Sequence, residues 1–172
     1  PQGSTDQLVG LAGDLLPDPR IGWISITDNP GGAPMLPPDY LAGKFAGHQS
    51  RIVLHLTCKD LNRNGLEAAA WRYAAEGFEN ILAITGDYPT TGFGGVAEPV
   101  FDLDSVGLIS LLRSMNDGLK IPSRRGGTET LPKTNFFIGC VVSPFKRHER
   151  ELMPQYFKLV RKIHVGAEWV IP

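Results

Sequence analysis

Apolar runs alternate with amphipathic segments along the chain, and this alternation predicts alternating strands and helices. The β-branched and aromatic runs that predict strands lie at residues 21–27, 51–57, 80–85, 135–143 and 168–171. Helical spacing of apolar positions, or many alanines, predicts helices at residues 4–16, 38–46, 64–77, 102–118 and 149–166. A Gly-, Pro- and Arg-rich stretch at 120–133 predicts a long loop.

Strands that are apolar on both faces and alternate with helices predict a parallel sheet covered by helices. A closed eight-fold barrel and an open doubly wound sheet both fit this order of elements. No Gly-x-Gly-x-x-Gly turn follows any of the predicted strands, which favours the (β/α)8 TIM barrel. Because such a barrel needs about 250 residues, we expect residues 1–172 to form one catalytic-barrel segment. It would be a partial arc, truncated at both ends, without the first strand and the last strands.

Composition excludes several classes of protein. Hydrophobic residues make up 42% and charged residues 20% of the chain, and the net charge is −1. These values indicate a globular protein and give no electrostatic reason to expect nucleic acid or a membrane surface as a partner. Cys58 and Cys140 match no metal-ligand spacing, so we expect no metal site and two buried, reduced thiols. We find no bilayer-spanning apolar run and no signal peptide, and therefore expect a cytoplasmic protein.

Polar residues stand where the predicted strands end, and in a parallel sheet these ends share one rim. They are Thr27, Asp28, His55, Thr57, Thr85, Asp87 and Ser143. In "ILAITGDYP" (81–89), Asp87 follows an apolar run directly, and a desolvated carboxylate there needs compensation. Simpler readings stay open: Asp87 as an Asx-turn residue, His55 as a hydrogen-bonded core histidine, and Lys162 as a solvated helix residue. The stretch "SRRGGTE" could bind a phosphate or be a solvated loop. The residues alone predict a barrel enzyme with a rim site.

Three stretches carry a resemblance that covers nearly the whole chain: "HLTCKD", "NILAITGDYP" and "NFFIGCVVSPFKRHERELMPQYFKLVRKIHVGAEWVIP". In order and spacing they resemble the methylenetetrahydrofolate reductase family. The resemblance implies a flavoprotein barrel with FAD at its carboxyl rim, which acts in one-carbon metabolism and methionine biosynthesis. The flavin takes a hydride from NAD(P)H or another donor and reduces 5,10-methylenetetrahydrofolate, or a related pterin, to the 5-methyl form.

The resemblance also assigns roles to residues. Asp87 is implied as the catalytic carboxylate, beside both the flavin and the bound pterin, where it favours the cationic iminium form of the folate. The implied cofactor-binding residues are Thr27, Asp28, His55, Thr85, Gly86, Asp87, Ser105, Val142, Lys146 and Lys162. Lys162 would approach the FAD diphosphate.

Several positions depart from the family pattern. Thr85 stands where many members have arginine, Val142 where some have an aromatic residue, and Lys146 where some have histidine. The family's general-acid glutamate would precede Pro1, and a substrate-binding glutamine would follow Pro172.

Two alternatives on the same barrel stay open, a non-redox pterin-binding module and a tetrahydrofolate-dependent methyltransferase. The resemblance does not identify the electron donor, which could be NADH, NADPH, ferredoxin or a partner subunit, and it leaves a homo-oligomer open.

Overall fold

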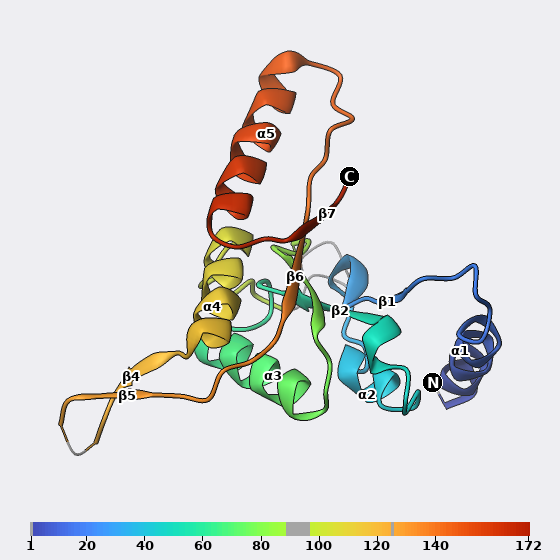
Figure 1. Ribbon diagram of the computed structural model, residues 1–172. Coiled ribbons are helices and arrows are strands. Elements are labelled where there is room, and N and C mark those ends of the chain that lie inside the picture. The colour runs from blue at the N-terminus through green and yellow to red at the C-terminus, as the bar shows by residue number, and fades with distance from the viewer. Residues whose placement is uncertain (1, 89–96, 125) are drawn as a thin grey trace.

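Five parallel strands form one sheet in the order β1-β2-β3-β6-β7. This computed structural model describes residues 2–88, 97–124 and 126–172 (Figure 1). The strands are β1 (Ile24–Ile26), β2 (Ile52–Thr57), β3 (Asn80–Ile84), β6 (Phe137–Val141) and β7 (Trp169–Ile171). In the pairing of β2 with β3, Thr57 lies beside Ile84, so the two carboxyl ends are level.

A helix connects each strand of the sheet to the next. These helices are α2 (Pro38–Ala42), α3 (Arg63–Ala75), α4 (Ser105–Asp117) and α5 (Glu149–His164), with short 3-10 turns at Pro30–Gly32 and Gln49–Arg51. A further helix, α1 (Gln2–Leu15), precedes β1. Side chains cap two of the helices, because Asn62 accepts a hydrogen bond from the Gly65 amide and Asp104 accepts from the amides of Val106 and Gly107. Pro154 lies inside α5.

The sheet is curled into a half-barrel, with the hydrophobic core on its helical side. Ile52, Leu54 and Leu56 of β2 belong to one core cluster with apolar residues of α3 and α4. Side chains alternate along a strand, so Val53, His55 and Thr57 point to the opposite, concave face. These findings confirm the partial TIM barrel and exclude the doubly wound sheet, whose two faces would both carry helices.

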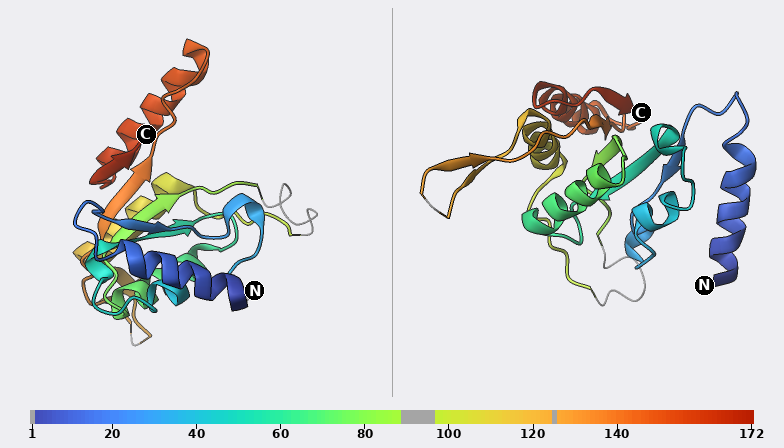
Figure 2. Two further views of the ribbon diagram at one scale, coloured as in Figure 1. Left: turned by 90° about the vertical axis from the view of Figure 1, so that its right-hand side faces the viewer. Right: turned by 60° about the horizontal axis from the view of Figure 1, so that its bottom comes forward.

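The predicted loop at 120–133 is wrong, because part of it forms an antiparallel hairpin. Its strands, β4 (Lys120–Pro122) and β5 (Thr128–Thr130), project away from the main sheet (Figures 1 and 2). Gly126 and Gly127 turn the chain with φ angles of 86° and 84°, in the left-handed region that glycine adopts without strain.

An arginine anchors the loop that joins α1 to β1. The Arg51 guanidinium donates to the carbonyls of Asp18 (3.2 Å) and Gly22 (3.3 Å), and also to those of Leu16 and Ile21. Its several donors in one plane suit a turn that presents carbonyl oxygens from different directions.

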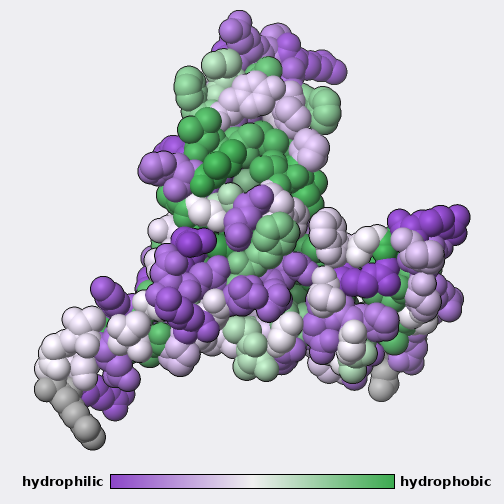
Figure 3. All heavy atoms as spheres, viewed as in Figure 1, coloured by the Kyte–Doolittle hydropathy of each residue, from purple (hydrophilic) through white to green (hydrophobic). Residues whose placement is uncertain are grey.

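The surface of α5 is more apolar than an exposed helix requires. Met153, Phe157, Val160 and Ile163 are all exposed, and Figure 3 shows apolar side chains gathered over this helix. No helix within the described residues combines the length and apolar character needed to cross a membrane.

Both cysteines are free and buried, as expected. Burial raises the pKa of Cys58 to about 12 and also raises the pKa of Cys140. The described part of the chain contains no group of His, Cys, Asp and Glu side chains arranged to hold a metal ion.

Candidate functional site

The carboxyl ends of β1 and β2 are joined by Asp28. Its carboxylate accepts hydrogen bonds from the Thr57 amide (3.1 Å) and from Thr57 Oγ1 (2.7 Å). Thr57 is buried, whereas Thr27, the residue before Asp28, is exposed. Asp28 is therefore a structural link at the rim, and Thr27 leaves a hydroxyl group accessible beside it.

His55 lies two residues before Thr57 on β2, so its side chain points to the same face of the sheet. Its Nε2 atom is 2.6 Å from Ser25 Oγ on β1. Burial lowers the pKa of His55 below its ordinary value, and the negative charge of Asp28 partly opposes that shift. The half-buried imidazole is thus favoured in its neutral form, with one ring nitrogen engaged by Ser25.

The end of β3 presents a hydroxyl pair and then a carboxylate. Thr85 Oγ1 lies 3.2 Å from Ser105 Oγ and 3.4 Å from the Ser105 amide, so the pair ties β3 to the first turn of α4. Ser105 is only 1% exposed. Gly86 follows with φ of 88°, and Asp87 is exposed. Among the residues that the structure describes, Asp87 has no hydrogen-bond or ion-pair partner.

The remaining candidates follow β6. The Val142 amide donates to the Ile171 carbonyl (2.9 Å), which extends the pairing with β7, and Lys146 is exposed in the loop before α5. Lys162 on α5 is 5% exposed, and its ammonium donates to the Val141 carbonyl at 2.7 Å. Burial lowers the pKa of Lys162, while the nearby Cys140 thiol acts in the opposite direction. Its ammonium therefore anchors α5 to the end of β6.

Sequence reasoning missed two charged residues at the β2 end. Lys59 and Asp60 follow the strand in "HLTCKD", and the Lys59 ammonium forms an ion pair with the Asp60 carboxylate. Asp60 also accepts a hydrogen bond of 2.9 Å from Asn29. Their position in the sequence could have indicated them, because they follow a predicted strand directly, as Asp28 and Asp87 do.

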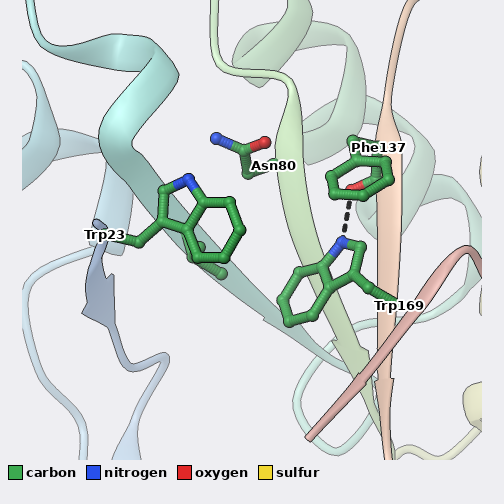
Figure 4. Close-up of a pocket in the computed structure, with 5 residues that line it drawn as sticks. Trp23, Asn80, Phe137 and Trp169 are labelled. Carbon is green, nitrogen blue, oxygen red and sulfur yellow. Dashed lines mark hydrogen bonds between the residues drawn. The ribbon is translucent and has the colours of Figure 1, made fainter.

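The opposite, amino ends of the strands are closed by aromatic rings. Trp23, Val53, Asn80, Phe137 and Trp169 surround a space of about 10 Å³ on the concave face (Figure 4). The Trp169 indole donates to the Phe137 carbonyl at 3.2 Å. A space of this size has no room for a cofactor or substrate.

Comparison with known proteins identifies the family. A family model described as methylenetetrahydrofolate reductase matches residues 20–172. The chain belongs to the methylenetetrahydrofolate reductase family. No curated protein matched the chain in a separate search.

Members of the methylenetetrahydrofolate reductase family are typically enzymes that bind FAD, and the family implies a folate substrate. On this half-barrel, seven of the predicted residues lie along the ends of β1, β2 and β3 or at the start of α4: Thr27, Asp28, His55, Thr85, Gly86, Asp87 and Ser105. Val142, Lys146 and Lys162 follow β6. Their roles toward a cofactor stay predictions. Pro89 of the "GDYP" turn and Arg125 of "SRRGGTE" lie outside the described residues.

Proposed function

We propose that this chain carries the rim of an FAD-dependent reductase of 5,10-methylenetetrahydrofolate or a related methylene-pterin. When bound, FAD would accept a hydride from NAD(P)H or another reduced donor and deliver it to the pterin. The chain's own residues would bind and orient the two ligands and stabilise charge on the pterin. Asp87 would be the catalytic carboxylate.

The observation that carries the proposal is the state of Asp87. It is an exposed carboxylate on the rim, directly after Gly86, with no partner among the described residues. Asp28, the corresponding acid at the end of β1, is instead bonded to Thr57. An unpartnered carboxylate can stabilise the cationic iminium form of a methylene-pterin, with an interaction of about 4 kcal/mol at 4 Å in a protein-like dielectric.

The chemistry of the available side chains fits FAD at this rim. Thr27 offers an accessible hydroxyl and His55 a largely neutral imidazole, and both suit the polar edge of an isoalloxazine ring or the ribityl chain. Lys146 is an exposed cation that could approach the diphosphate. Lys162 keeps two N–H donors beside the one given to the Val141 carbonyl, but it is buried and would have to become accessible to reach a diphosphate.

Purification of the protein tests the proposal directly. We expect a yellow protein with one FAD per chain, which a reduced nicotinamide bleaches and methylenetetrahydrofolate then reoxidises. A colourless protein that added FAD does not reconstitute would contradict the proposal. Flavin that is reduced by the donor but never reoxidised by any methylene-pterin would contradict the assigned substrate.

One observation favours a second candidate, a pterin-binding module without redox activity. Thr85 is uncharged and bonded to Ser105, and the Lys162 ammonium is buried against the Val141 carbonyl, so neither position presents an accessible cation to a diphosphate. Tetrahydrofolate binding by a protein that takes up no FAD would support this candidate. Stoichiometric FAD together with oxidation of NADH would exclude it.

A further inference from the structure

Lys59 is a buried charge in the middle of the rim, and neither the family match nor the proposed function assigns it a role. It lies just beyond the end of β2, it is 1% exposed, and its ammonium forms an ion pair with Asp60. Isolated ammonium groups cost several kcal/mol to bury. A lysine in such a place is tolerated because the Asp60 carboxylate compensates its charge.

The aliphatic part of Lys59 supports the end of β3. A Cβ atom placed on Gly86 would lie 3.0 Å from Lys59 Cδ and 3.1 Å from Lys59 Cγ. The Lys59 stem therefore packs against the backbone of the residue that immediately precedes Asp87. Gly86 has φ of 88°, so this turn combines a backbone conformation that favours glycine with a close contact to the Lys59 stem, which an added side chain would have to displace by a few tenths of an ångström.

The charged end of Lys59 reaches the end of β1 through Asp60, and the Lys59 backbone makes a separate contact with the segment before α4. The Asp60 carboxylate that pairs with Lys59 also accepts a hydrogen bond of 2.9 Å from the Asn29 side chain. Asn29 follows Asp28 at the end of β1. The Lys59 carbonyl accepts a hydrogen bond of 2.9 Å from the Val100 amide. One residue thus connects the ends of β1, β2 and β3 with the segment that leads into α4.

Packing alone does not account for a lysine here. An unbranched apolar side chain such as methionine would fill the same space beneath Gly86, and replacing a buried ion pair by apolar residues is often neutral or stabilising. What an apolar residue cannot do is hold Asp60, and through Asp60 the Asn29 loop, in a fixed relation to the β3 end.

We propose that Lys59 is a positioning residue that fixes the Gly86–Asp87 turn relative to the β1 end, through the chain of contacts Lys59–Asp60–Asn29. The effect of Lys59 on ligand binding rests on the proposed function, in which Asp87 and Asp28 form two sides of one flavin and pterin site. The contact chain itself can be tested without any ligand.

The test compares Lys59→Met, which keeps an unbranched stem and removes the charge, with Lys120→Met at an exposed position on the β4–β5 hairpin. NMR order parameters of the Gly86, Asp87 and Asn29 amides are measured in the absence of flavin. We expect them to fall from the rigid value of about 0.85 to below about 0.6 in Lys59→Met and to stay unchanged in Lys120→Met. In the FAD-loaded protein, we expect the dissociation constant of FAD to rise about tenfold in Lys59→Met only.

A double variant separates positioning from stability. Asp60→Asn alone leaves the Lys59 ammonium without a carboxylate, and we expect its melting temperature to fall. The pair Lys59→Met and Asp60→Asn should recover the melting temperature and leave the turn mobile, which a purely structural role of the ion pair would not produce.

Unchanged order parameters in a folded Lys59→Met protein would overturn the inference. If Lys59→Met does not fold, Asn29→Gly decides, because glycine tolerates the φ of 42° at this position and removes the amide that donates to Asp60, together with the side-chain oxygen that accepts from the Met35 amide at 2.8 Å. A rigid turn in folded Asn29→Gly would then overturn it. A mobile turn in Lys59→Met combined with a wild-type protein that binds no FAD would support the role of Lys59 and refute the proposed function.

Discussion

Asp28 and Asp87 lie beyond the carboxyl ends of β1 and β3, the two strands that flank β2, yet their surroundings differ. Asp28 accepts two hydrogen bonds from Thr57, whereas Asp87 is exposed and follows a glycine in the left-handed region. A carboxylate that already accepts hydrogen bonds has less capacity to stabilise a charged ligand. At the residue scale, Asp87 is therefore the better candidate for chemistry and Asp28 for support.

Replacing Asp87 by asparagine removes the charge and keeps the size of the side chain. We expect Asp87→Asn to retain FAD, to be reduced by the donor at nearly the wild-type rate, and to reduce the methylene-pterin about 100-fold more slowly, because only the pterin half-reaction passes through the cationic iminium form. Stopped-flow measurement of the two half-reactions checks this. Equal slowing of both half-reactions would indicate that Asp87 is only a turn residue.

His55 makes stability depend on pH. Burial lowers its pKa in the folded protein, so the unfolded chain binds more protons once the pH falls below the ordinary histidine pKa of about 6.5. The contribution of His55 to stability is complete above that pH and decreases as the pH falls from there through the folded-state pKa.

We therefore expect the wild-type protein to lose more unfolding free energy between pH 8 and pH 5 than His55→Gln, in denaturant titrations at both pH values. The same loss in both proteins would show that the Ser25–His55 contact stabilises the charged ring as well as the neutral one.

At the scale of elements, β6 and β7 are packed through a tryptophan on β7 that lies against a glycine on β6. The Trp169 ring lies directly over Gly139, where an added Cβ atom would be 2.2 Å from the ring carbon Cζ2. The glycine is thus required by the indole on the neighbouring strand, and the indole in turn closes the amino end of the concave face.

Substituting alanine for Gly139 should force Trp169 out of this position. We expect Gly139→Ala to lower the unfolding free energy by about 1–3 kcal/mol, the usual cost of overpacking, and to change the tryptophan fluorescence. Gly13→Ala in α1 is the matched control, because nothing lies within 4 Å of its added Cβ atom. A Gly139→Ala protein as stable as that control would contradict the assigned packing.

The main strands and helices could be predicted from the sequence because they are apolar or amphipathic runs; even β1 and β7, with three residues each, lie in apolar stretches. The β4–β5 hairpin could not, because its strands read Lys-Ile-Pro and Thr-Glu-Thr and contain no apolar run or apolar alternation that marks a strand. The glycines at its turn appeared in the sequence as loop residues, and only strand pairing distinguishes a hairpin from a loop.

The candidate site, too, could be predicted from the sequence only in part. The rim residues could be predicted because parallel strands bring their carboxyl ends together whatever the side chains are. The position of Lys59 beneath Gly86 depends on contacts across two strands, and a lysine after a strand is most simply expected to be solvated. The engagement of Lys162 by the Val141 carbonyl is unpredictable for the same reason.

At the scale of the whole molecule, the concave face has two unlike ends. Indole and phenyl rings close the amino end around a space of about 10 Å³, while the carboxyl end carries hydroxyl, imidazole and carboxylate groups from three adjacent strands. A polar ligand with an aromatic ring system suits the second end, which is the end that barrel enzymes use.

Amide hydrogen exchange of the protein with and without added FAD tests this claim most directly. We predict that FAD slows exchange at residues 27–29, 55–60 and 84–88 and leaves the amides of Trp23, Asn80, Phe137 and Trp169 unchanged. Protection confined to the amino ends of the strands, or no protection anywhere at saturating FAD, would contradict a flavin site on the carboxyl rim.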